Sequence, residues 1–275
     1  MKLVTKPSPC FITPTAYLEK YASQSNNHLC LAHIVDRDPV YADFYKKMSD
    51  RGDLVIMDNS AFELLEPYSP DKLFELGKKC GAHVLVLPDY PFKKGEVTIE
   101  AAKKYIPIFK GAGFKTFFVP QSETGDLEDY IATYKWAAEN PDVDVIGCSI
   151  LGMPNALPNI PKAYARVVMT QLLIDRGIFN FDKHHHYLGY ITPMEIPVLL
   201  GMRALDTADS SNQVWYGING HKYNQDYESL VVRKEMLRPV DFNEPWHMSN
   251  SIHCAIQKNI DWTKDIFNEY NKRNN

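Results

Sequence analysis

Short apolar runs alternate with longer amphipathic stretches along most of the chain, and this alternation limits the fold more than any other feature of the sequence. Such a repeat is typical of β-α-β units, which build a parallel sheet. The amphipathic stretches carry apolar residues at helical spacing, as Leu73 and Leu76 do within residues 70–80. The expected strands span residues 29–35, 54–58, 84–88, 116–120, 143–149, 186–190 and 204–207.

A weaker eighth strand is expected near residues 214–218, and eight strands close a barrel. We therefore expect an α/β protein with a (β/α)8 TIM barrel. A doubly wound sheet is the alternative, but no Gly-rich GxGxxG turn follows an early strand to support it. The barrel is expected over residues 1–222. We expect residues 223–275 to form a helical C-terminal extension packed on the barrel, because an independent domain of that size would have marginal stability.

Composition excludes several classes of protein. The 275 residues carry a net charge of -4, which argues against broad electrostatic coating of nucleic acid but allows a local basic groove. Prolines interrupt the start of the chain, where a signal peptide would be apolar, and no run approaches a membrane span. The five cysteines are widely spaced and form no metal-binding cluster. We expect a cytoplasmic protein with no membrane partner.

Acidic residues follow several of the expected strands, at the edge where parallel α/β folds bind their ligands. Asp58 and Asp206 each end an apolar run. Two carboxylates at one barrel mouth can divide the work at a sugar carbon, one as the nucleophile and the other as the acid that protonates the leaving group. The competing interpretation of each aspartate is a cap on the next helix or turn.

Three further residues suit a planar base. Asp89 could accept hydrogen bonds from the ring N–H and the exocyclic amine of a purine, and the Gln121 amide can both donate and accept. Phe62, four residues after Asp58, could provide a stacking surface. Each signal is weak alone, since Asp89 also suits a turn before Pro91 and Phe62 also suits the core.

These residues lie within a series of six short sequence segments. In chain order they read DNSAF from Asp58, PD from Pro88, VPQ from Val119, GCSILG from Gly147, HYLGYITP from His186 and GMRALD from Gly201. The residues of these segments and their order in the chain resemble the tRNA-guanine transglycosylase superfamily, over roughly residues 29–210. Members of that superfamily are (β/α)8 barrels that exchange guanine for a 7-deazaguanine.

The resemblance implies catalytic roles for two aspartates. Asp58 would be the acid and base. The nucleophile falls on Asp206, because the same interval separates it from Gly201, and Asp209 is the alternative. The residues implied to bind the base, by stacking, by hydrogen bonds or through the loop against it, are Phe62, Asp89, Gln121, Ser149, Gly152 and Leu188.

The chain also departs from the superfamily. The Cys-x-Cys-x-x-Cys and His zinc site has no counterpart, so we expect neither a metal nor another cofactor. The segment Ser210-Ser211-Asn212 replaces the basic residues that follow the nucleophile in tRNA-modifying members. A shortened, zinc-free relative is similar to the DNA-modifying branch of phages and genomic islands, which inserts bases such as preQ0. The expected function is thus a pentosyltransferase that exchanges guanine in DNA for a 7-deazaguanine.

Several alternatives stay open. The acceptor could be tRNA, or the chain could be a non-catalytic barrel subunit of a heterodimeric transglycosylase. A homodimer and a partner subunit are both open as assemblies. Lys93, Lys94 and Lys183 are weak candidates for phosphate contacts. The consecutive residues His184-His185-His186 are expected on the surface or in a loop, with one side chain at most near the site, because neighbours on an extended chain point to opposite faces.

Overall fold

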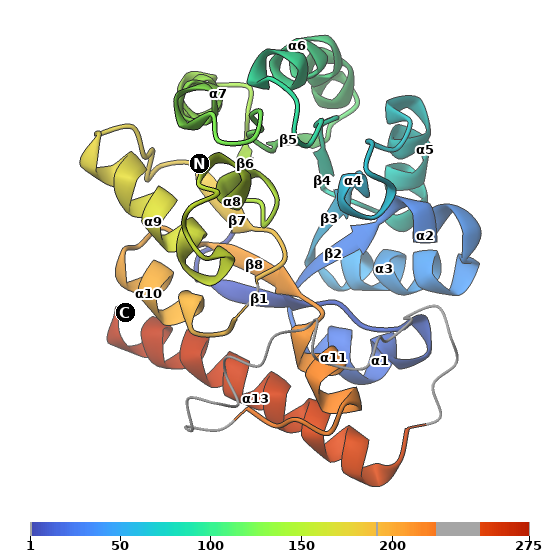
Figure 1. Ribbon diagram of the computed structural model, residues 1–275. Helices are drawn as coiled ribbons and strands as arrows, with labels where there is room; N and C mark the ends of the chain where they lie inside the picture. Colours follow the sequence, from blue (N-terminus) through green and yellow to red (C-terminus); the bar gives the residue numbers. More distant parts are fainter. Residues whose placement is uncertain (1, 191, 224–247, 275) are drawn as a thin grey trace.

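The computed structural model describes residues 2–190, 192–223 and 248–274. Eight parallel strands form one sheet in the order β1-β8-β7-β6-β5-β4-β3-β2. β1 and β2 also lie against each other, so the sheet is a nearly closed barrel surrounded by helices (Figure 1). The expected α/β fold, a (β/α)8 TIM barrel, is confirmed. The strands are β1 (Ser8–Phe11), β2 (Asn27–Leu31), β3 (Leu54–Asp58), β4 (Val84–Val86), β5 (Lys115–Phe118), β6 (Val145–Gly147), β7 (His184–Tyr187) and β8 (Thr207–Ser210).

Helices follow the strands and cover the outside of the barrel (Figure 1). Local sequence sets their ends: Asp38 caps α3 by accepting hydrogen bonds from two backbone N–H groups, and Gly52, at φ 96°, ends that helix. The α-helices in the described part of the chain are α1 (Leu18–Tyr21), α2 (Ala32–Arg37), α3 (Pro39–Arg51), α4 (Ala61–Leu64), α5 (Pro70–Cys80), α6 (Gly95–Gly111), α7 (Leu127–Glu139), α8 (Gly152–Ala156), α9 (Lys162–Asp175), α10 (Glu195–Gly201), α11 (Asn212–Ile218) and α13 (Asn250–Arg273).

Alternate residues of each strand face the barrel interior and the surrounding helices. In β5, Phe117 packs inside the barrel with Val84 and Val145. Its neighbour Phe118 faces outward, where it contacts Trp136 of α7. The strand register therefore decides which side chains can reach the interior and which are buried under helices.

The expected eighth strand is wrong. Residues 214–218 are apolar and aromatic, which favours a strand locally, but they lie in α11 because that helix packs against α13. A Cβ at Gly217 would come within 2.4 Å of Ile256 Cγ1. The missing strand is β1, where Pro9 removes a ladder donor and breaks the usual strand pattern.

Three other expected strands are displaced along the chain. The strand expected at residues 186–190 is β7, at His184–Tyr187. β2 ends at Leu31, and α2 begins at Ala32. β8 begins only at Thr207, because Ala204 and Leu205 are buried in the core beneath the helices before pairing starts. Asp206 consequently precedes its strand instead of ending it.

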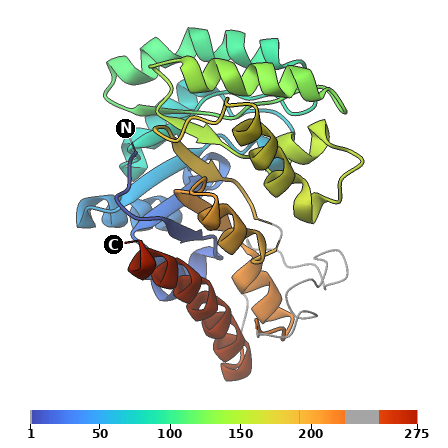
Figure 2. The same cartoon turned by 90° about the vertical axis from the view of Figure 1, so that its left-hand side faces the viewer.

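The C-terminal helix α13 lies beside α11 and contacts β1 (Figures 1 and 2). Asn259 connects the two segments: its Oδ1 accepts a hydrogen bond from Tyr223 N at 2.6 Å, and its Nδ2 donates to Gln213 O at 3.0 Å. Most of the expected extension between Tyr223 and α13, residues 224–247, lies outside the described residues. Within the described ranges, no helix has the length and apolar character to cross a membrane.

Candidate active site

The carboxyl ends of the strands open into a cavity of about 1360 Å³. All eight strands, or the loops that follow them, contribute to its wall. Most of the residues expected at the site therefore meet in one place, although Gly152 and Asp206 are not in the wall. Those that line the cavity are Asp58, Phe62, Asp89, Gln121, Ser149 and Leu188, together with the alternative nucleophile Asp209.

Asp58 is the last residue of β3 and is buried. Ser60 N donates a hydrogen bond to Asp58 Oδ2 at 2.8 Å. Ser60 has a φ of 59°, which non-glycine residues seldom adopt, and this turn aims its N–H at the carboxylate. Burial raises the pKa of Asp58 well above its ordinary value, and the nearby Glu63 and Asp89 raise it further. This environment favours the protonated acid, the form that can protonate a leaving group.

Asp89, after β4, is at the centre of a buried hydrogen-bonded group. Asn59 Nδ2 donates to Asp89 Oδ1 at 2.7 Å, and Gln121 Nε2 donates to Oδ2 at 2.6 Å. Burial raises the pKa of Asp89 to about 6, against the effect of these two hydrogen bonds. Asp89 is therefore an ionised acceptor at neutral pH. Asn59 was not among the expected site residues, and its position directly after β3 is the only signal in the sequence that could have indicated it.

Gln121 also presents an acceptor to the site. Its Oε1 atom is buried and has no hydrogen-bond partner among the described residues. Gly152 packs closely against this loop, since a Cβ there would lie 3.2 Å from Gln121 Oε1 and 2.7 Å from Pro120 O. Gly152 thus makes room for Gln121 and does not itself touch the cavity. An unpaired buried acceptor is costly, so it points to a ligand that carries an N–H or O–H donor.

Ser149, Leu188 and Phe62 complete the expected binding residues. Ser149 Oγ accepts a hydrogen bond from Leu151 N at 3.0 Å, so it shapes its own loop as well as the cavity wall. Leu188 gives the wall an apolar surface. Phe62 is 57% exposed, so it is not a core residue, and it stands at the cavity with its ring accessible.

Asp209 lies within β8 and lines the cavity. Gly189 N donates a hydrogen bond to Asp209 Oδ1 at 3.0 Å, and His186 Nε2 lies 3.0 Å from the same oxygen. Among the described residues, Oδ2 makes no hydrogen bond. One oxygen is thus held in place while the other is available for chemistry.

Asp206 lies at the opposite end of β8, away from Asp58. Lys2 Nζ contacts Asp206 Oδ1 at 2.7 Å, and His185 N donates to Oδ2 at 2.9 Å. Both oxygens are therefore engaged at the amino end of the barrel. The expectation that Asp206 stands at the mouth is wrong, because β8 begins one residue after Asp206. Asp209 occupies that place instead.

The three consecutive histidines form β7 and are all buried, so their expected place on the surface or in a loop is wrong. Their side chains alternate as neighbours on a strand must. The His186 ring packs inside the barrel against Phe117. His185 faces outward, where its Nε2 lies 2.7 Å from the Tyr134 hydroxyl of α7.

A buried ion pair supports the cavity from behind. Arg166 of α9 pairs with Glu195 through Nε–Oε2 and Nη2–Oε1 contacts of 2.9 and 2.6 Å. Arg166 Nη1 also donates to Cys148 O and Leu188 O, the backbones of two cavity loops. The guanidinium therefore fixes the loops after β6 and β7 relative to each other. Sequence alone gave no signal for it, since the pair joins residues from separate helices.

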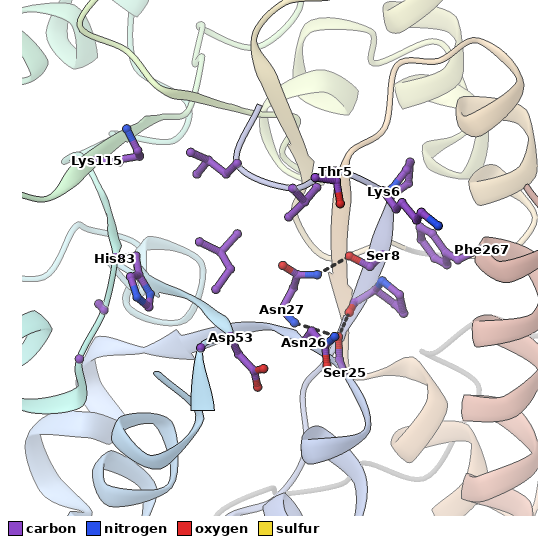
Figure 3. A pocket seen from close by; sticks show the side chains of 18 of the residues that line it. Thr5, Lys6, Ser8, Ser25, Asn26, Asn27, Asp53, His83, Lys115 and Phe267 are labelled. Atoms are coloured by element: carbon purple, nitrogen blue, oxygen red, sulfur yellow. Dashed lines mark hydrogen bonds between the residues drawn. The ribbon is translucent and has the colours of Figure 1, made fainter. Parts of the chain in front are cut away.

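A second pocket, of about 1110 Å³, lies at the amino ends of β1–β5 (Figure 3). Asn27 Nδ2 donates to Ser8 Oγ there, and Ser25 Oγ donates to Pro9 O at 2.6 Å. Lys183 also lies at this end, where Nζ donates to Asn140 O and Val143 O. It is therefore remote from the mouth and unsuited to the phosphate contact expected of it.

No family model matches the chain, and no curated protein matches it either. Within the described ranges, no three His, Cys, Asp or Glu side chains are arranged to hold a metal ion. The geometry of the cavity is therefore the basis for assigning a function.

Proposed function

We propose that the protein is a transglycosylase that exchanges guanine in DNA for a 7-deazaguanine base such as preQ0. One observation carries the proposal: a single cavity brings together the carboxylates of Asp58 and Asp209 and a buried acceptor set formed by Asp89 and Gln121. Five of the six segments that resemble the superfamily contribute to this cavity. The sixth, which ends at Asp206, does not, so we assign the nucleophile to Asp209.

The two carboxylates have environments suited to different tasks. In the first step Asp209 Oδ2 attacks C1′ of the deoxyguanosine nucleotide, the C1′–N9 bond breaks with its electron pair on the base, and Asp58 gives the base a proton. In the second step the incoming base gives its N9 proton to Asp58, and N9 displaces Asp209 from C1′. Each step inverts C1′, so the exchange proceeds with retention.

The acceptor set selects guanine-like bases over adenine. The ring N–H and exocyclic amine of guanine can donate to Asp89, and Gln121 Oε1 can accept another N–H donor. Adenine has an acceptor at N1 and would place a lone pair against a buried carboxylate, which costs far more than the loss of one hydrogen bond. A 7-deazaguanine keeps the donors of guanine and changes only the other edge.

The rim of the cavity suits a strand of nucleic acid. Phe62 and Tyr164, which both line it, are 57% and 55% exposed and can stack on neighbouring bases. A base in a duplex must leave the stack to enter such a cavity. The preference for DNA over tRNA rests on the resemblance, namely on the missing zinc site and on Ser210-Ser211-Asn212 in place of basic residues.

The test is incorporation of radiolabelled guanine or preQ0 into DNA and, in parallel, into tRNA by the purified protein. We expect label in DNA. Label in tRNA alone would identify RNA as the acceptor, and label in neither would overturn the proposal. A matched pair of variants, Asp209→Asn and Asp206→Asn, separates the two candidate nucleophiles: only the first should lose a protein–DNA adduct that survives denaturing electrophoresis.

A further inference from the structure

A chain of hydrogen bonds crosses the barrel interior and ends at Asp209. It joins Leu3 N to His184 Nδ1 at 3.3 Å, and His184 Nε2 to Thr207 Oγ1 at 2.8 Å. It continues from Thr207 Oγ1 to His186 Nδ1 at 2.7 Å, and from His186 Nε2 to Asp209 Oδ1 at 3.0 Å. His184, His186 and Thr207 are fully buried.

The direction of this chain follows from its first member. A backbone N–H can only donate, so His184 Nδ1 must be the unprotonated nitrogen, and the proton of the neutral ring is on Nε2. Burial lowers the pKa of His184 well below its ordinary value, in keeping with a neutral ring. His184 Nε2 therefore donates to the Thr207 hydroxyl.

The hydroxyl of Thr207 determines which nitrogen of His186 accepts a hydrogen bond. Its oxygen accepts from His184, so its single hydrogen is available for His186 Nδ1, the other partner of Thr207 Oγ1. A ring that accepts at Nδ1 carries its proton on Nε2, which then donates to Asp209 Oδ1. All four hydrogen bonds thus point one way, toward the cavity.

We propose that His186 is a positioning residue for Asp209, and that Thr207 fixes its tautomer by relaying the hydrogen bond that begins at Leu3 N. With Gly189 N, His186 places two donors on Oδ1. Rotation of the carboxylate would lose both bonds, so Oδ2 is held toward the cavity as the reacting oxygen. The catalytic part of this inference rests on the proposed function, whereas the tautomers do not.

The first test measures the imidazole ¹⁵N shifts of His184 and His186 in the unliganded protein. We expect both rings in the neutral form with the proton on Nε2. Thr207→Ser keeps the hydroxyl and should leave both tautomers unchanged, whereas Thr207→Val should remove the preference of His186. A doubly protonated His186, or a proton on its Nδ1, in the unaltered protein would overturn the relay, and this result needs no folded variant and no activity.

The second test compares base exchange in the same variants. Thr207→Val should lower kcat by about tenfold to a hundredfold, the range for one hydrogen bond to a charged group, with KM little changed. Thr207→Ser should keep most of the rate of the unaltered protein. His186→Gln should also keep most of it, because the glutamine amide can still donate a hydrogen bond to Asp209. Equal rates for Thr207→Val and Thr207→Ser in an enzyme that exchanges bases would refute the positioning role. If the unaltered protein exchanges no base, the proposed function fails and the tautomers alone decide the relay.

Discussion

The two ends of the barrel use polar side chains in opposite ways. At the amino end, in the pocket of Figure 3, polar groups pair with one another: Asn27 with Ser8, Ser25 with Pro9 O, and Asp53 with His28 and Arg51. At the carboxyl end, the cavity keeps buried acceptors whose partners are incomplete, most clearly Gln121 Oε1. Pairing at one end stabilises the fold, while unpaired acceptors at the other end suit a ligand.

The two aspartates within residues 205–210 show the same contrast over a short stretch of chain. Asp206 has both oxygens engaged by Lys2 and His185. Asp209 has its described side-chain hydrogen bonds on Oδ1 only. Residue type alone does not distinguish Asp206 from Asp209, the proposed nucleophile, whereas the end of β8 at which each aspartate lies does.

The largest expected effect comes from replacing each of these two aspartates in turn by asparagine. Asp209→Asn should lower the rate of base exchange by at least about a thousandfold, because it removes the proposed nucleophile. Asp206→Asn should leave the rate close to that of the unaltered protein. Steady-state incorporation of labelled guanine measures both. The reverse ranking would show that the contrast between the barrel ends has been assigned the wrong way round.

A smaller loss is expected from the acid at the same end. Asp58→Asn keeps the size of the side chain but cannot transfer a proton, so exchange should fall by about a hundredfold to ten-thousandfold. Guanine should still bind, because Asp89 and Gln121 are untouched. Single-turnover rates and equilibrium binding, measured on the same preparation, separate the two effects. Loss of binding with unchanged chemistry would place Asp58 in recognition and remove it from catalysis.

The acceptor Asp89 predicts a pH dependence. Its pKa is raised to about 6, so the ionised acceptor is lost as the pH falls through that value, and guanine affinity should drop by about tenfold for each pH unit below it. For stability the sign is opposite: a raised pKa means that the folded state holds the proton more tightly, so this contribution is present below the unfolded value of 3.8 and is lost as the pH rises through about 6.

Calorimetric titration of guanine between pH 5 and pH 8 checks this prediction without catalysis. Asp89→Asn should bind more weakly at pH 8 and should lose the step near pH 6. A step that persists in Asp89→Asn would assign the titration to another group, of which Asp58 is the nearest candidate.

The smallest effect is expected at the amino end. Lys115, in the pocket of Figure 3, lies 3.5 Å from Asp144, and both side chains are partly exposed. Lys115→Met should lower the free energy of unfolding by about 1 kcal/mol or less and leave base exchange unchanged. Chemical denaturation and the incorporation assay test the two halves. A clear loss of exchange would show that the amino-end pocket has a functional role.

The sequence predicted most of the barrel because burial leaves a strong pattern. The strand expected at residues 54–58 coincides with β3. Asp58, Asp89 and Gln121, which the resemblance selected, line one cavity. β1 was missed because a proline interrupts so short a strand. α11 was misread because its packing against α13 involves residues distant in sequence.

The choice between Asp206 and Asp209 depended on a boundary that local pattern does not fix. Ala204 and Leu205 are apolar and buried, as strand residues are, yet they pack beneath helices before the ladder begins. Because β8 starts three residues later than expected, Asp206 lies at the amino end of the barrel and not at its carboxyl end. The hydrogen-bonded chain through His184 and His186 was equally hidden, because it requires knowing that β7 lies beside β8.

The pairing of β1 with β8 has a consequence for the newly made chain. Ser8 pairs with Thr207, so the first strand must wait until nearly the whole barrel has left the ribosome before it finds this neighbour. Asp209 lies on that late strand, whereas Asp58 and Asp89 belong to early ones. We expect an unfinished chain that lacks β8 to have an incomplete cavity without the proposed nucleophile, so that activity would arise only after β8 has been made.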